Sequence, residues 1–257
     1  MRVATLSLRG TRDEWAARRG VLRDCFRRYS PDLVTFQESV VTGGYDQVHD
    51  ILGPGYHVVH QTVRGEDGRG VSTASRWPIH DIVEVDLDVS ARTLGYACTS
   101  LVAETFAPAP IGRVLLVNNR PGGRLDMERE REIQAVRAAR TVEELAARRP
   151  AHVVVAGDFD ADPDAASLRF WCGRQSLHGL SVCYRDAWVA AHPADSGHTR
   201  VPGGLPFGRV DYVLVRCGPD GPTLAVEGCE RILDEPVDGV WASDHFGLIA
   251  DLVPLTE

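Results

Sequence analysis

Short runs of apolar residues follow one another along most of this chain, and their spacing predicts more strands than helices. Residues 3–8 alternate apolar with small polar side chains, which is typical of a strand that faces a core. By the same pattern, further strands are predicted at residues 33–37, 56–63, 70–75, 79–87, 97–106, 113–118, 152–156, 209–215, 223–233 and 246–253.

Two longer segments have the apolar spacing of helices. Residues 12–29 place Leu22 and Phe26 on one face, and residues 127–149 form a second, highly charged helix. Helices separate only a few of the strands, and short turns join the others, which favours antiparallel pairing. We therefore expect an α/β sandwich of two packed, mixed and largely antiparallel sheets flanked by helices, in one domain over residues 1–257.

Polar side chains lie at the ends of several predicted strands. They are Ser7, Glu38, Asp158, Asp160, Asp211, Asp244 and His245. Taken singly, a carboxylate after a strand can be solvated, cap a helix or shape a turn. Asp211 lies among apolar residues, where an unpaired carboxylate is costly, and His245 is a natural partner for it. Together these groups predict a site that holds a hard cation and moves a proton.

Six segments, in order along the chain, resemble the motifs of the endonuclease/exonuclease/phosphatase superfamily of magnesium-dependent, deoxyribonuclease I-like phosphoesterases. The matching segments are residues 2–10, 31–38, 75–79, 157–160, 209–212 and 243–245. The resemblance covers nearly the whole chain and implies a four-layered α/β sandwich. This fold agrees with the one expected from the strand and helix pattern.

The resemblance also implies a role for each polar residue. Glu38 corresponds to the principal ligand of Mg²⁺ or Mn²⁺, and Asp244 to a second carboxylate at or near the metal. Asp158 orients or activates the attacking water. Asp211 pairs with His245, which polarises the nucleophile or stabilises the transition state. Clustered carboxylates need a hard cation to coexist, and such a cation neutralises the developing phosphorane charge.

Three positions depart from the family pattern. Ser7 stands where the first strand usually ends in Asn, and Asp160 stands where an Asn usually donates to the phosphate. Asn119 stands at about the position of a His that donates to the scissile phosphate or its leaving group, and an amide cannot shuttle a proton. Alternation along the strand is expected to point Arg120, a possible substitute, away from its neighbour Asn119. Losing one such group typically costs about 10²–10⁴ in rate, so hydrolysis is expected to be weakened or altered.

The net charge of the chain indicates which class of substrate to expect. A net charge of −8 disfavours a protein that grips long duplex DNA, because phosphate contacts usually need a basic face. We therefore expect a small or short phosphoester as substrate. The sequence specifies neither the oligomeric state nor the number of metal ions.

Targeting signals are not evident in the sequence. No apolar run approaches the ~20 residues that a membrane span needs, and the first residues lack the apolar stretch of a signal peptide. The six cysteines have no metal-binding spacing, which predicts buried, reduced thiols and a cytoplasmic protein.

Two functions remain open at this point. The first is a slow or specialised phosphoesterase that depends on Mg²⁺ or Mn²⁺. The second is a family member recruited to another reaction or to ligand binding as a pseudoenzyme. The retained Glu38, Asp158, Asp211, Asp244 and His245 favour a working site, and a purely structural protein would leave these five groups unexplained.

Overall fold

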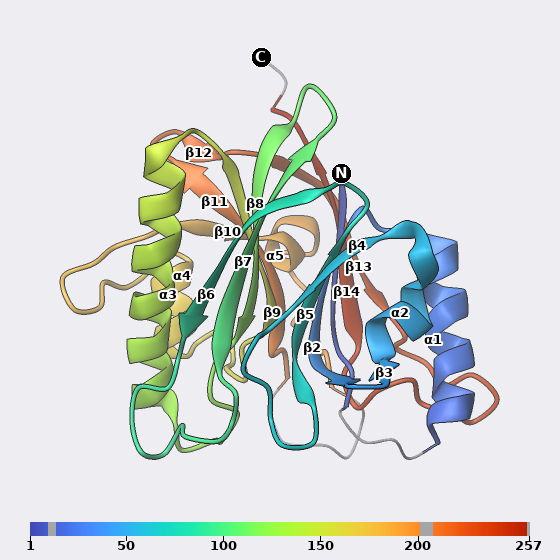
Figure 1. The fold of residues 1–257 in the computed structure, drawn as a ribbon. Helices are drawn as coiled ribbons and strands as arrows, with labels where there is room; N and C mark the ends of the chain where they lie inside the picture. Colours follow the sequence, from blue (N-terminus) through green and yellow to red (C-terminus); the bar gives the residue numbers. More distant parts are fainter. Residues whose placement is uncertain (10–13, 201–207, 256–257) are drawn as a thin grey trace.

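The computed structural model describes residues 1–9, 14–200 and 208–255, and the structural statements below concern this part of the chain. Two seven-stranded sheets pack against each other, and helices cover the outer face of each sheet (Figure 1). One outer layer contains α1 (Trp15–Tyr29) and α2 (Gln47–Leu52), and the other contains α3 (Glu128–Arg148) and α4 (Ala166–Trp171). The predicted four-layered α/β sandwich is confirmed.

The first sheet contains both ends of the described chain. Its strand order is β13-β14-β1-β2-β5-β4, with β3 paired to β2. β1 and β2 are parallel, and the other neighbours are antiparallel. The strands are β1 (Arg2–Ser7), β2 (Leu33–Thr42), β3 (Tyr45–Asp46), β4 (His57–His60), β5 (Arg69–Ser75), β13 (Ala225–Ile232) and β14 (Gly247–Val253).

The second sheet is built in a similar way around one parallel pair. Its strand order is β10-β11-β9-β8-β7-β6, with β12 paired to β11. Only β8 and β9 are parallel neighbours in the described sheet. The strands are β6 (Ile79–Asp86), β7 (Thr99–Ala107), β8 (Gly112–Arg120), β9 (His152–Asp158), β10 (Tyr184–Asp186), β11 (Asp211–Gly218) and β12 (Gly221–Pro222).

The central strands are buried on both faces, and alternate residues serve different cores. In β1, Val3 belongs to the core between the sheets, whereas Ala4 and Leu6 pack with Leu22 and Phe26 of α1. α3 packs its alanine and valine side chains on the outer face of the second sheet. The helix periodicity of the sequence therefore matches the face that each long helix buries.

The space between the sheets becomes polar toward the carboxyl ends of β1 and β9. There Thr5 donates to the Gln37 side chain at 3.4 Å, and Gln37 donates to Asn118 Oδ1 at 2.8 Å. Asn118 in turn donates to two main-chain carbonyls of the opposite sheet, those of Phe36 and Ser72. These buried amides satisfy one another, so the two sheets are joined by a fixed polar network next to the site described below.

The structure adds short elements that the apolar pattern did not predict. They are α2, the five-residue helix α5 (Ala187–Ala191), a 3₁₀ turn at Gly53–Gly55, and β3, β10 and β12. The first residues of the helix expected at 12–29, and Gly10 of the first motif, lie outside the described residues. Among the described helices, none combines the length and apolarity that crossing a membrane requires.

The expectation of six buried cysteines is only partly right. All six thiols are free, but Cys183 is exposed, and only Cys98 and Cys229 are fully buried. Burial raises the pKa of the Cys98 thiol to about 11 and that of the Cys229 thiol to about 12. Both buried thiols are therefore protonated and unreactive at neutral pH.

Candidate active site

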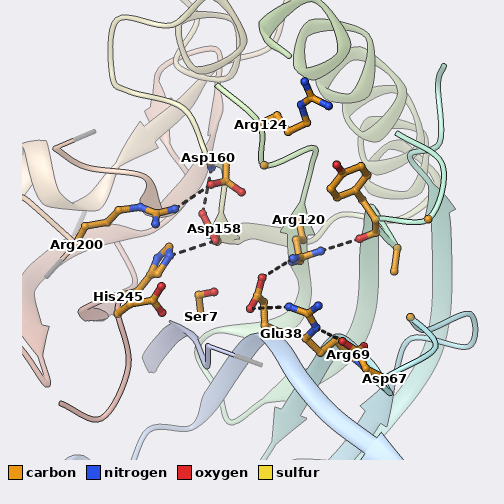
Figure 2. A pocket seen from close by; sticks show the side chains of 16 residues that line it. Ser7, Glu38, Asp67, Arg69, Arg120, Arg124, Asp158, Asp160, Arg200 and His245 are labelled. Carbon is orange, nitrogen blue, oxygen red and sulfur yellow. Dashed lines mark hydrogen bonds and ion pairs between the residues drawn. The ribbon is translucent and has the colours of Figure 1, made fainter. Parts of the chain in front are cut away.

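The polar end of the inter-sheet space opens into a cavity of about 400 Å³ (Figure 2). Ser7, Arg120 and Asp158, the last residues of β1, β8 and β9, all line it. The full lining consists of Ser7, Glu38, Gly65, Asp67, Arg69, Gly95, Tyr96, Ala97, Arg120, Gly123, Arg124, Asp158, Asp160, Arg200, Asp244 and His245. The cavity thus brings together all of the predicted site residues except Asp211, which lies directly behind His245, and Asn119.

Glu38 reaches the cavity because β2 is irregular at this residue. Its φ is +55°, and the register of β2 against β5 shifts between Phe36 and Ser39. A bulge of this kind redirects a side chain and is common beside active sites. The Glu38 carboxylate is paired with Arg120 at 2.7 Å and with Arg69 at 3.8 Å. The predicted metal ligand is therefore already in contact with two guanidinium groups.

Arg120, rather than Asn119, is the β8 residue that faces this cavity. Its Nη1 donates to the Tyr96 carbonyl at 2.9 Å, and its Nη2 binds Glu38. Asn119 points to the opposite face of the sheet, where its amide oxygen accepts from Ser100. The two neighbours do point apart, as expected, but the assignment of Asn119 to the cavity side was wrong.

The glycine-rich turn before β5 delivers a second charged pair to the cavity. Gly68 has a φ of +80°, and a Cβ there would lie 2.6 Å from the Val41 carbonyl oxygen, so the turn requires glycine. The turn places Asp67 and Arg69 in the lining, where they bind each other. From the sequence this glycine-rich segment was interpreted as a turn without a functional role, although its charged residues were a signal for the cavity lining.

His245 lies between two buried carboxylates. Its Nδ1 is 2.9 Å from Asp211 Oδ2, and its Nε2 is 3.8 Å from Asp158 Oδ2. Burial alone would lower the pKa of His245, but the charges of Asp211 and Asp158 outweigh it and raise the pKa to about 10. The predicted contact between Asp211 and His245 is present, and His245 is an imidazolium at neutral pH.

The two carboxylates differ in their partners. Burial and the neighbouring charge of Asp211 raise the pKa of Asp158, while His245 opposes the shift. Asp211 is completely buried, and its Oδ1 has no hydrogen-bond partner among the described residues. The main chain around Asp211 is held by the Thr199 hydroxyl, which accepts from its N–H at 3.3 Å.

Asp160 is neutralised by a partner that the sequence did not reveal. It has a φ of +48°, and its side chain is 3.0 Å from Arg200 Nη2 (Figure 2). Burial and the charge of Asp158 raise the pKa of Asp160 to about 6 even so. Arg200 pairs with His245 through an isolated β-bridge, so the fold, not a local motif, brings this arginine to the cavity.

Comparison with known families agrees with this arrangement. The sequence profile of the Endonuclease/Exonuclease/phosphatase family matches residues 5–245. The chain belongs to this family. No curated protein sequence matches it significantly.

Solved structures with the same fold extend over the whole chain. Humanized D. rerio TDP2 is 18% identical, with a TM-score of 0.75 and coverage of 98% of both chains. The human Nocturnin catalytic domain with bound sulfate is 15% identical, with a TM-score of 0.76 and coverage of 99% of this chain and 94% of that one. An endonuclease/exonuclease/phosphatase protein from Bacteroides vulgatus is 19% identical, with a TM-score of 0.74 and coverage of 99% and 98%. At these identities the likeness shows the fold.

Two groups of residues in this family member could hold a divalent cation. Asp158, Asp211 and His245 offer ligand atoms within 4.8 Å of one another. However, the charges of Asp211 and Asp158 raise the pKa of His245, so a cation at this group would have to displace a proton that the imidazole holds firmly. Glu38 and Asp244 offer carboxylate oxygens in the same cavity, which are the donors that Mg²⁺ and Mn²⁺ prefer. The donor set of Glu38 and Asp244 therefore fits a hard cation better.

Proposed function

We propose that this protein is a phosphoesterase that hydrolyses a small or short phosphoester with the help of Mg²⁺ or Mn²⁺. The observation that carries the proposal is the convergence of Glu38, Asp158, Asp244 and His245 on one cavity of about 400 Å³. A cavity of this size is typical of sites for small molecules. Family membership supports phosphoester chemistry in general, and the substrate size and metal dependence are our proposal.

In this mechanism Glu38 and Asp244 would hold the cation. When bound, it neutralises charge that develops on the phosphoryl oxygens. Asp158 accepts the proton of the attacking water, a role to which its raised pKa is suited, because a carboxylate of ordinary pKa is a weak base. Asp158 also accepts the main-chain N–H of Asp160 at 3.1 Å, which fixes the orientation of its carboxylate.

His245 stabilises the transition state as an imidazolium. Asp211 holds its Nδ1–H, so the Nε2–H points toward Asp158 and the space where the phosphoryl group would lie. The charge is in place before the substrate arrives, which is the condition for efficient electrostatic stabilisation.

The arginines of the lining supply the remaining positive charge. The cavity is lined by four arginines, Arg69, Arg120, Arg124 and Arg200. One guanidinium group can donate two parallel hydrogen bonds to two oxygens of the same phosphate. One protein of the same fold, D. rerio TDP2, is known in a complex with a single-strand DNA product. A DNA end is therefore one short substrate to test, although the net charge of −8 still disfavours a long duplex.

A second candidate function is supported by the ion pair of Glu38 with Arg120. If this pair persists in the working protein, the site binds an anionic ligand without a cation, and the chain acts as a ligand-binding or otherwise recruited family member.

The test compares Glu38→Gln with Glu104→Gln. Glu104 is a matched control, because it is also a strand carboxylate paired with two arginines, Arg113 and Arg149, but lies outside the cavity. Turnover of a chromogenic phosphodiester, a phosphomonoester and short single-stranded DNA is measured with Mg²⁺, with Mn²⁺ and with a chelator. We expect metal-dependent turnover that Glu38→Gln abolishes and Glu104→Gln retains. Absence of turnover with all three substrates would favour the second candidate function.

A further inference from the structure

Arg120 lies where it can contact both the Glu38 carboxylate and an anion bound in the cavity. Its side chain is largely buried and is bound to Glu38 through Nη2 and to the Tyr96 carbonyl through Nη1. Its Nε is buried and has no hydrogen-bond partner among the described residues. Arg200, across the cavity, also has a buried Nε without such a partner. Unpaired buried donors are costly, so these two groups are available to an acceptor that the described residues do not supply.

The ion pair of Arg120 with Glu38 also opposes cation binding. A carboxylate bonded to a guanidinium must share or lose this partner when it binds a cation, and the freed guanidinium then lacks its counter-charge. Arg69 does not relieve this cost, because it is a second cation that binds Asp67 and also lies 3.8 Å from Glu38. The free-energy cost of binding the cation falls if an oxyanion replaces Glu38 as the partner of Arg120, since guanidinium groups bind tetrahedral oxyanions well.

We propose that Arg120 couples the two ligands of the site, so that a tetrahedral oxyanion draws it away from Glu38 and thereby raises the affinity of Glu38 for a divalent cation. This inference rests on the proposed function for its choice of ligands. The two ligands are thermodynamically linked. If the oxyanion raises the affinity of the protein for the cation by some factor, the cation must raise the affinity for the oxyanion by the same factor. Arg120 is accordingly a positioning and binding residue, and substrate and metal assemble together rather than independently.

The experiment measures Mn²⁺ binding by electron paramagnetic resonance, with sulfate as the oxyanion probe. Titrations are made with and without sulfate at matched ionic strength, and Mn²⁺–sulfate association is subtracted using protein-free samples. For the wild-type protein we expect sulfate to tighten Mn²⁺ binding by about 5- to 150-fold, the usual range of coupling between two ligands. Glu38→Gln should remove the sulfate-dependent Mn²⁺ binding.

Two arginine variants locate the coupling. Arg120→Gln should bind Mn²⁺ more tightly than the wild type without sulfate, and sulfate should no longer change the affinity. Arg113→Gln is the matched control, because Arg113 lies on the same strand and pairs with a glutamate, Glu104, outside the cavity. It should behave as the wild type does. Arg120→Lys keeps the charge and should retain part of the coupling, which also covers the case in which Arg120→Gln fails to fold.

The outcomes separate this inference from the proposed function. An unchanged Mn²⁺ affinity on adding sulfate to the wild type, undetectable Mn²⁺ binding, or full coupling in Arg120→Gln would each overturn the inference. Coupling without any phosphoester turnover would leave the inference standing and reject the proposed function. Turnover without coupling would reject the inference and leave the proposed function standing.

Discussion

The two walls of the cavity differ in how their charges are neutralised. On one wall, His245 and Asp211 are buried, with side-chain exposures of 5% and 0%, and they neutralise each other. On the opposite wall, Glu38 is 24% exposed and is neutralised by arginines (Figure 2). Both walls keep carboxylates that the family motifs predict, but on the arginine-rich wall Glu38 is paired with Arg120 and Arg69, which the motifs did not predict. The buried wall holds the groups that we propose move the proton, and the arginine-rich wall holds the groups that we propose bind the cation and the anion.

The largest effect is expected from breaking the buried wall with Asp211→Asn. An amide cannot stabilise the imidazolium as a carboxylate does, so the pKa of His245 should fall well below its present value of about 10. We expect kcat to fall by about 10²–10⁴. The pKa is checked by NMR titration of the imidazole protons, and turnover by the diester assay. An unchanged histidine titration together with unchanged turnover would contradict the role of this wall.

The raised pKa of His245 also makes the stability of the folded protein depend on pH. The pKa of His245 is raised from 6.5 to about 10, so the folded state holds this proton more strongly than the unfolded chain does. The resulting stabilisation is fully present below pH 6.5 and is lost as the pH rises through about 10. Asp211→Asn should therefore flatten the loss of stability of the wild type between these pH values.

A second, smaller effect is expected on the arginine-rich wall. Arg120→His puts an imidazole where β8 faces the cavity, and an imidazole can protonate a leaving group whereas a guanidinium cannot. We expect about a tenfold gain in kcat for a substrate with a poor alkoxide leaving group, below the usual range for acid catalysis because the new side chain lacks supporting contacts. KM should rise, because the guanidinium that we propose binds the oxyanion is lost.

Its control is the neighbouring Asn119→His. Asn119 faces the other side of the sheet, is 3% exposed and bonds Ser100, so this variant should give no gain and should be less stable. A gain from Asn119→His, and none from Arg120→His, would show that the assignment of the two faces of β8 is wrong.

The smallest expected effect concerns Asp160, which lies beside the buried wall. Its pKa is raised from 3.8 to about 6, so the folded state ionises this carboxyl less readily than the unfolded chain does. The resulting loss of stability is zero below pH 3.8, grows as the pH rises, and is complete above pH 6. Asp160→Asn should raise the free energy of unfolding by about 1–3 kcal/mol at pH 8 and by less at pH 4.5. Denaturant unfolding at the two pH values measures the difference. An equal change at both values would mean that loss of the contact with Arg200, not charge burial, dominates.

Much of the fold was predictable because local spacing reflects burial. The strands near residues 33–37 and 152–156 and the helices ending at Tyr29 and Arg148 were found from apolar periodicity. The short helices α2 and α5 were missed, because six and five residues are too few for a helical pattern. Their starts are capped by Asp46 and Asp186, whose side chains accept main-chain N–H groups.

The orientation of β8 shows why part of the site could not be predicted. Leu115 and Val117 pack under α3, while Val114 and Leu116 pack between the sheets, so both faces of the strand are apolar. A strand buried on both faces has no polar alternation to show which residues face the site. The choice between Asn119 and Arg120 therefore depends on the pairing of the sheets.

The sequence by itself determined the family, the strands that carry the motifs, and the carboxylates and histidine that converge, because these residues follow directly from buried strands. The tertiary structure decided which charges meet. Arg120 of β8 meets Glu38 of β2 only when the two sheets are packed, whereas Arg69 reaches Glu38 from the neighbouring strand β5 and Arg200 reaches Asp160 from a segment 40 residues away. Long-range ion pairs leave no local pattern in a sequence, because their geometry depends on the relative placement of separate strands and loops.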